Sequence, residues 1–248
     1  MKDFFKKIWR FIWKSVIFFL ILSITTAIIY RWLPIPITPL MLIRCVEQKA
    51  ENKDIKLEKD WVAFEEISQN LQLAVVCSED QNFIIHRGFD FTAIEKAMEY
   101  NSKHRKQRGA STISQQTAKN VFLWPGRSWI RKGFEVYFVF LIETLWSKER
   151  IMEVYLNVIE IGDGVYGAQA AALIYFNKNA AYLTKAEAAL IAAVLPNPLK
   201  FSVAKPSSYI RYRQNWIIRQ IGLWGGTLNY EVPVEKVKIK KKRKRKAD

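Results

Sequence analysis

The stretch from Cys77 to Asp90, CSEDQNFIIHRGFD, groups several side chains that could do chemistry. Two carboxylates, Glu79 and Asp80, precede His86, and the wholly apolar LAVVC runs directly into them. A carboxylate that emerges from a buried segment tends to have a raised pKa, which suits general acid or base catalysis. If the stretch is helical, Glu79 and His86 are seven residues apart and lie on one face.

Three interpretations of this stretch stay open on its own residues. A solvated helix edge fits the spacing as well as a catalytic carboxylate does. A metal site would draw on Asp80, His86 and His104, but the chain has only 2 histidines and no tight pairing of ligands. Its 2 cysteines, Cys45 and Cys77, form no CxxC, so a zinc site is not indicated and two inert thiols are favoured over a disulfide.

Two further polar clusters follow along the chain. RGASTISQQTAKN, at 108–120, is either a mobile loop or a surface that binds sugars or phosphates. GRSWIRKGFE, at 126–135, is either a solvated helix face or an anion site. The solvated face would contain an ion pair between Arg131 and Glu135, one helical turn apart. The anion site is suggested because cations at the start of a helix oppose its dipole, and a bound anion would relieve that cost. The candidate binding residues are Ser111, Gln115, Gln116 and Lys119 in the first cluster and Arg127, Arg131 and Lys132 in the second.

Apolar residues at helical spacing predict the elements that position these clusters. Helices are expected over 91–100, 131–147, 147–157, 167–176, 184–196 and 206–222. The second of these is expected to be buried and central, since only Glu135 and Glu143 interrupt its apolar run. Thr184 and Glu187 have the spacing of a capping box, and the last helix is expected to end at Gly222. Period-2 alternation is almost absent, which predicts an all-α domain.

The N-terminal sequence predicts a membrane anchor. An uncharged run from Ser15 to Tyr30 would rise about 24 Å as a helix, slightly less than a hydrocarbon core of ~30 Å. Lys14 and Arg31 flank the run and can extend toward the lipid headgroups. The basic residues before it place the N-terminus in the cytoplasm and the rest of the chain across the membrane. A cleaved signal peptide is the alternative, but no A-x-A site follows.

The net charge is +16, and the C-terminal run KVKIKKKRKRK supplies nine of the 39 basic residues. Such a run is typical of a solvated tail, and it also fits nucleic acid or an anionic membrane. The three prolines of 33–43 predict an extended exit from the membrane. The expected organisation is a cytoplasmic basic segment at 1–14, an anchor at 15–32, a linker at 33–60, the main domain at 61–230 and a basic tail at 231–248.

Four motifs that contain the candidate residues occur in order along the chain. They are EDxxFxxHxG at 79–88, GxSTxxQQxxKN at 109–120, RKxxE at 131–135 and YLNxxExG at 155–162. Together they resemble the successive motifs of the family 51 glycosyltransferases, the polymerases of peptidoglycan glycan chains. The resemblance extends over roughly Trp61 to Gly222 and is closest to the monofunctional branch, with one catalytic domain behind an anchor. A bifunctional relative with transpeptidase activity would need the motifs SxxK, SxN and KTG in that order. This chain has only chance matches at SVAK (202–205) and SQN (68–70), in reversed order, and no KTG, so no transpeptidase activity is expected.

The resemblance implies an all-α, lysozyme-like domain with a smaller membrane-proximal lobe, preceded by one transmembrane helix. It implies polymerisation of lipid II by inverting glycosyl transfer, with release of undecaprenyl pyrophosphate. By motif, Glu79 is the general base and Glu135 the second essential carboxylate, near the donor phosphates. Asp80 and His86 receive structural roles around Glu79. The implied substrate- and pyrophosphate-binding residues are Ser111, Gln115, Gln116, Lys119, Arg127, Arg131 and Lys132.

The implied partners are lipid II, the growing glycan chain, membrane lipids and cell-wall synthesis proteins, with no nucleic acid. No metal ligand is assigned and no cofactor is required, although a divalent cation, Mg²⁺ or Mn²⁺, is compatible with the pyrophosphate. The implied location is the inner membrane, crossed once, with the catalytic domain on the periplasmic side. The alternatives are a lytic transglycosylase or lysozyme-like hydrolase, and a non-enzymatic basic membrane protein.

Overall fold

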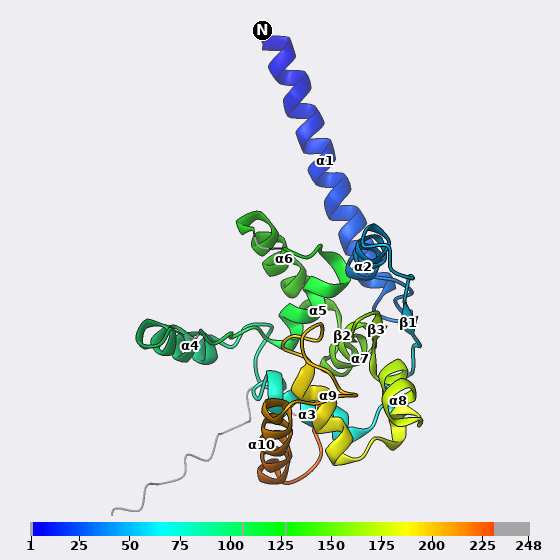
Figure 1. The fold of residues 1–248 in the computed structure, drawn as a ribbon. Helices are drawn as coiled ribbons and strands as arrows, with labels where there is room; N and C mark the ends of the chain where they lie inside the picture. Colours follow the sequence, from blue (N-terminus) through cyan, green and yellow to red (C-terminus); the bar gives the residue numbers. More distant parts are fainter. Residues whose placement is uncertain (1, 106, 127, 231–248) are drawn as a thin grey trace, which may run out of the picture.

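Helices form most of the chain, as the apolar spacing predicts. The structure, a computed structural model, describes residues 2–105, 107–126 and 128–230. Figure 1 shows these helices gathered below the long N-terminal helix. Within the described residues the helices are α1 (Lys2–Ile29), α2 (Pro39–Ala50), α3 (Gln69–Glu79), α4 (Phe91–Lys103), α5 (Ile113–Phe122), α6 (Trp129–Leu145), α7 (Lys148–Val158), α8 (Ala168–Phe176), α9 (Lys185–Val194) and α10 (Ser208–Trp224), with 3₁₀ turns at Phe64–Glu66 and Ala180–Tyr182.

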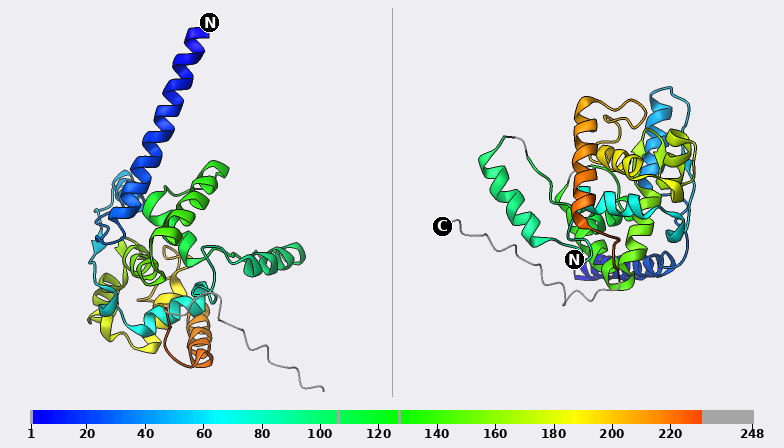
Figure 2. Two further views of the ribbon diagram at one scale, coloured as in Figure 1. Left: turned by 180° about the vertical axis from the view of Figure 1, so that it is seen from behind. Right: turned by 90° about the horizontal axis from the view of Figure 1, so that it is seen from below.

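Helix α3 forms the centre of the larger, lower part of the domain in Figure 1. Its residues from Leu71 to Cys77 are all buried, and α9 and α10 pack against it and against each other. Helix α9 begins with the predicted capping box of Thr184 and Glu187. Above this part, α5 packs against α2, α6 and α7, and α6 packs against α1. The smaller lobe therefore lies next to the N-terminal helix, as the views in Figure 2 also show.

Three short strands are an addition that the sequence does not predict. Strands β1 (Glu58–Lys59), β2 (Glu160–Gly162) and β3 (Val165–Tyr166) form one sheet in the order β1-β3-β2. The β1–β3 pair is parallel and the β2–β3 pair is antiparallel. Strands this short are too brief for period-2 alternation to reveal them. The rest of the described chain is helix, turn or loop, so the all-α prediction is confirmed.

The exit from the membrane is shorter than predicted. Helix α2 begins at Pro39, so the extended conformation expected for 33–43 is wrong for its second half. Thr38 caps the helix, since its side chain accepts a hydrogen bond from the backbone nitrogen of Met41 at 3.4 Å. Proline is favourable at the first helical position because it has no N–H to leave unpaired there. The segment predicted as a linker thus contains a helix that packs against α5.

Helix α6 is not buried on every side, contrary to the prediction. Phe138 and Ile142 on its inner face are buried in the core. On its other side, Trp129 is 92%, Ile130 74% and Phe140 70% exposed. A continuous apolar run cannot distinguish a helix surrounded by protein from one that faces protein on one side and a membrane on the other.

Two other predicted helices are confirmed with differences in detail. Helix α4 covers the expected 91–100, yet it projects from the domain (Figures 1 and 2) and none of its residues is buried. Its apolar face is therefore unpartnered, with Phe91 76% exposed. Helix α10 continues beyond Gly222, because the glycine that adopts the left-handed conformation and ends the helix is Gly225, with φ of 75°.

Helix α1 is long and apolar enough to cross a membrane. The candidate span is Asp3–Ile29, and a window of 18 residues within it has a mean hydropathy of 2.1. Two side chains of the domain, Trp146 and Arg150, hold the end of α1 that is nearest the domain. The indole of Trp146 donates to the carbonyl oxygen of Ala27 at 2.8 Å, and the guanidinium of Arg150 donates to that of Tyr30 at 2.9 Å. These bonds satisfy carbonyl groups that a helix end leaves open, so the anchor has a defined direction relative to the domain.

The turn from β3 into α8 gives a test of this fold. Gly167 has φ of 82°, and a Cβ added there would lie 2.7 Å from the backbone oxygen of Asn157. We expect Gly167→Ala to lower the free energy of unfolding by about 2–4 kcal/mol, because it combines a left-handed alanine with a backbone clash. Gly109→Ala is the matched control, since its Cβ would meet nothing within 4 Å. Equal thermal denaturation midpoints for the two variants would contradict this role of Gly167.

Candidate active site

The first motif is not one continuous helix. Helix α3 ends at Glu79, Asp80 follows as its C-cap, and turns lead on toward α4. The condition under which Glu79 and His86 would share one helical face is therefore not met. The carboxylate of Asp80, at the end of the helix, bonds to groups outside α3.

Asp80 is buried and joins three segments of the chain. Nε2 of His86 lies 2.9 Å from its Oδ2, and the backbone nitrogen of Ile113 donates to the same oxygen at 3.0 Å. Ile113 is the first residue of α5, so Asp80 accepts from one of the amides that a helix start leaves unpaired. Thr112, the N-cap of α5, donates to the backbone oxygen of Gly88 at 2.7 Å. This junction gives His86 the structural role that the motif implies.

Glu79 is held at the end of α3 by three donors. The hydroxyl of Ser78 lies 3.0 Å from its Oε1, and Nη2 of Arg213 lies 3.4 Å from the same oxygen. The amide of Gln116 donates to Oε2 at 3.2 Å. The hydroxyl of Tyr155 in turn donates to Oε1 of Gln116 at 3.2 Å, which orients the amide. The Glu79 side chain is only 12% exposed, so these donors fix its direction in a largely buried setting.

The carboxylate of Glu79 borders a cavity of about 230 Å³, which we call the carboxylate cavity. Asp80 and Asp90 also line it, and Lys96 contributes a cation from α4. Ser111 lines it from the segment before α5. A neutral hydroxyl that enters this space meets several acceptors, of which Glu79 is the one held by a glutamine, a serine and an arginine.

Gln116, which donates to Glu79, lines a second cavity of about 350 Å³, which we call the cation cavity. Lys119 comes into it from α5, Arg131 from α6 and Arg44 from α2. Nε of Arg131 is buried and has no hydrogen-bond partner within the described residues. A buried guanidinium with a free donor is suited to a charged oxygen ligand. One residue, Gln116, therefore connects Glu79 with a site for an anion.

Glu135 holds the cations beside this cavity. Its side chain is buried and accepts from Nη1 of Arg131 at 3.3 Å and from Nζ of Lys132 at 2.5 Å. Burial lowers the pKa of Lys119, the negative charge of Glu135 opposes this shift, and the charge of Arg131 adds to it. Lys119, Arg131 and Lys132 share the single negative charge of Glu135, so these four residues together keep a net positive charge that can attract an anionic ligand.

Two of the predicted binding residues that the structure describes, Gln115 and Lys132, line neither cavity. The side chain of Gln115 accepts from the backbone nitrogen of Thr112 at 2.9 Å and completes a capping box at the start of α5. We therefore assign Gln115 to the helix cap, in place of the substrate contact that its motif implies. The Ser/Thr-x-x-Gln spacing is itself the signature of a capping box, so the sequence holds the signal for this role. Arg127 lies outside the described residues.

Two arginines that the motifs do not include also reach the site. Arg213 comes from α10, and it stands in RYRQNWIIR, where nothing distinguishes it from its neighbours. Only the packing of α10 on α3 turns it toward Glu79. Arg44 lies 3.4 Å from Glu160, a buried motif residue, and burial raises the pKa of Glu160 although Arg44 opposes the shift. The sequence gives no signal for Arg44, because 33–60 is expected to be a linker.

Lysine and arginine supply the positive charge here. Within the described residues no group of three or more His, Cys, Asp or Glu side chains could hold a metal ion. His104 stacks on Tyr100, with 3.9 Å between ring centroids. Cys45 and Cys77 are both free, and burial raises the pKa of Cys77 to about 11, which keeps it a thiol at neutral pH.

A largely buried, oriented carboxylate that contacts a residue of a cation-lined cavity is an arrangement that suits transfer of a group from an anionic leaving group. The model of the Transglycosylase family matches residues 47–222. Three relatives carry the name biosynthetic peptidoglycan transglycosylase. The one from Bacteroides thetaiotaomicron is 55% identical over 241 residues, or 97% of this chain and 96% of the relative. The one from Mannheimia succiniciproducens is 50% identical, over 92% of this chain and 92% of the relative. The one from Pseudomonas aeruginosa is 47% identical, over 89% of this chain and 95% of the relative. The chain therefore belongs to the transglycosylase family.

Lys119 should make anion binding sensitive to alkaline pH. Because its pKa is lowered, the ammonium group loses its proton at a lower pH than an ordinary lysine, and the attraction for an anion is lost there. Lys119→Arg keeps its charge, so we expect binding of undecaprenyl pyrophosphate to persist to higher pH in this variant. Lys178→Arg, at an ion pair with Glu187, is the control. The same pH dependence in all three proteins would show that Lys119 does not titrate with binding.

Arg213 should act as a positioning residue for Glu79. Arg213→Gln removes the charged donors to Glu79 and Ser78, and we expect kcat for glycan polymerisation to fall roughly tenfold with KM little changed. Arg213→Lys should recover part of the loss. Arg211→Gln, on the same helix, loses only a contact with Gln214 and serves as the control. A fall in Arg213→Gln that appears in KM alone would assign Arg213 to substrate binding.

Proposed function

We propose that this protein is a membrane-anchored peptidoglycan glycosyltransferase that polymerises lipid II into glycan strands. The observation that carries the proposal is the contact of Glu79 with Gln116, because Gln116 also lines the cation cavity. Family membership and the names of the relatives support the same activity.

The reaction divides between the two cavities. The 4-hydroxyl of the acceptor sugar lies at the carboxylate cavity and gives its proton to Glu79. Its oxygen then attacks C1 of the donor, the bond from C1 to the pyrophosphate oxygen breaks, and the anomeric centre inverts. Undecaprenyl pyrophosphate leaves with the bonding electrons. Ser111 lines the carboxylate cavity and can bond the acceptor, and Gln116 stands between acceptor and donor.

The leaving group is stabilised by charge. Lys119, Arg131 and Lys132 surround Glu135, and they meet the negative charge that grows on the pyrophosphate as the bond to C1 breaks. Glu135 orients Arg131 and Lys132. This explains how a second carboxylate can help a site that must attract anions. Arg127 belongs to the proposed set by its motif. A Mg²⁺ or Mn²⁺ ion would be held by the oxygen atoms of the pyrophosphate itself, and the proposal requires no resident metal.

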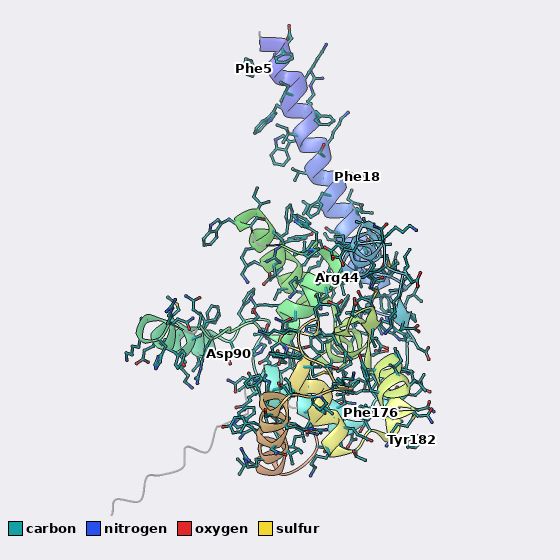
Figure 3. All side chains as sticks on the ribbon, viewed as in Figure 1. Phe5, Phe18, Arg44, Asp90, Phe176 and Tyr182 are labelled. Atoms are coloured by element: carbon teal, nitrogen blue, oxygen red, sulfur yellow. The ribbon has the colours of Figure 1, made fainter. Side chains whose placement is uncertain are left out.

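The membrane-facing side of the domain supports this assignment. Figure 3 places Arg44, which lines the cation cavity, close to the domain end of α1, whereas Asp90, which lines the carboxylate cavity, lies farther from the anchor. The exposed apolar side of α6 is in the same lobe. A lipid pyrophosphate at a bilayer surface would thus meet the cations first. The basic residues before the span favour a cytoplasmic N-terminus and a domain on the periplasmic side. The proposal places the protein in the inner membrane, where the lipid-linked substrate and other cell-wall synthesis proteins would be.

A hydrolase that cleaves finished glycan is the second candidate. Such an enzyme has no pyrophosphate to bind, so the cation cavity argues for the polymerase. A non-enzymatic function of the basic tail rests on Lys236–Lys246, which lie outside the described residues.

Replacement of the base tests the proposal. Glu79→Gln keeps the size of the side chain but cannot accept the proton, and we expect polymerisation of lipid II to fall by roughly 10²–10⁴-fold. The assay is gel separation of glycan strands made by the full chain in detergent. Glu99→Gln changes a carboxylate on the exposed surface of α4, and its activity should match the parent.

Two outcomes would overturn parts of the proposal. Parental rates in Glu79→Gln would remove Glu79 as the base. Release of soluble fragments from finished peptidoglycan by the parent protein, without polymer from lipid II, would establish the hydrolase.

A further inference from the structure

An apolar groove of about 620 Å³ lies between the anchor and the smaller lobe. Helix α1 forms one wall and the first two turns of α6 form the other. The lining residues are Ser15, Val16, Phe19, Leu20, Ile130, Gly133, Phe134 and Tyr137. The hydroxyl of Tyr137 is already bonded to Ser23 at 2.7 Å, so the groove presents almost only carbon to a ligand.

The groove adjoins the cation cavity through one helix. On α6, Arg131 lines the cation cavity while Ile130 and Phe134 line the groove. The two spaces are separated by a pair of rings, because Trp124 lines the cation cavity and lies 6.3 Å from Phe134 between ring centroids. A molecule with a charged head and an apolar chain could therefore occupy both.

The groove is built by fixed contacts. Phe19 of α1 packs on Phe134 of α6 with 5.4 Å between ring centroids, and the hydrogen bond between Ser23 and Tyr137 lies one turn along. Gly133 leaves the floor open, since a Cβ added there would meet nothing within 4 Å. Glycine in a helix interior costs roughly 1 kcal/mol relative to alanine, so the open floor is kept at the expense of helix stability.

We propose that this groove binds the isoprenoid chain of a lipid pyrophosphate whose head lies in the cation cavity. The inference rests on the proposed function, and it adds a site for the chain that the motifs do not contain. The adjoining cations select this occupant, because Lys119, Arg131 and Lys132 fit a pyrophosphate at the end of the chain.

The groove determines how the donor approaches Glu79. With the chain between α1 and α6, the pyrophosphate enters from the side of Arg131, and C1 of the sugar points on toward Gln116. The anchor is then part of the binding site as well as a tether. Bonds from Trp146 and Arg150 hold the domain end of α1, and Phe19 and Ser23 hold it against α6 next to the groove.

Photo-crosslinking tests the occupant directly. The probe is undecaprenyl pyrophosphate with a photoreactive group on its chain, added to the full chain in nanodiscs of phosphatidylethanolamine and phosphatidylglycerol. We expect labels on the peptides that contain Phe19 and Phe134, and unlabelled undecaprenyl pyrophosphate should compete with them. A phospholipid that carries the same photoreactive group is the comparison. Equal labelling by the phospholipid, without competition, would show that the groove holds bilayer lipid and would overturn the proposal.

A substitution that fills the floor gives the second test. Gly133→Leu should raise KM for the undecaprenyl donor about fivefold and leave a donor with a short geranyl chain unchanged. The change is modest because a displaced chain enters a bilayer that is also apolar, so only packing contacts are lost. Gly222→Leu is the matched control, another helical glycine whose added Cβ meets nothing within 4 Å.

The two tests separate failure of the groove from failure of the proposed function. Equal loss with both donors, or no loss with either, would overturn the role of the groove while polymerisation by the parent still stands. If the parent makes no polymer, the proposed function fails, and crosslinking still reports whether the chain binds in the groove.

Discussion

The carboxylate of Asp80 joins three segments that are distant in the sequence, and the geometry of the site depends on that junction. It follows the last residue of α3 and accepts from the first amide of α5 and from His86. Glu79 and Gln116 become neighbours because the two helix ends meet at this carboxylate. Lys119 follows Gln116 by three residues on the same helix, so one turn of α5 carries both the partner of the base and a cation of the anion site.

The cation cavity shows why such a site needs Glu135. Burying Lys119, Arg131 and their neighbours is unfavourable, and the lowered pKa of Lys119 records part of that cost. Glu135 lies on α6 with Arg131 and Lys132, pairs with both of them, and keeps them ordered when no ligand is bound. The remaining positive charge and the Nε of Arg131, which has no partner within the described residues, are then available to an anion. In the proposed function, stability and substrate affinity draw on the same three cations.

Much of the fold and of the site is predictable from the sequence, and the errors have physical causes. Helices with strong periodicity and caps are found. The motifs give Glu79, which lines the carboxylate cavity, and Gln116, Lys119 and Arg131, which line the cation cavity, while Lys132 pairs with Glu135 beside it. Arg213 and Arg44 are missed because tertiary packing alone turns them inward from α10 and α2. Gln115 is assigned to substrate, although its spacing from Thr112 fits a helix cap. The apolar run of α6 implies full burial because apolar composition does not tell protein from lipid as a neighbour.

The exposed side of α6 follows from the physical state of the substrate. A lipid-linked sugar diffuses in two dimensions, and an enzyme anchored in the same surface encounters it at a high effective concentration. Anchoring alone does not align the pyrophosphate with the base, since the headgroup can rotate about its chain. In the proposed function helix α6 combines both tasks, because Arg131, held by Glu135, lines the cation cavity while Ile130 and Phe134 line the groove beside α1. Its apolar outer residues cost little in a bilayer but would be unfavourable in water, which fits a helix that orients the leaving group at a membrane surface.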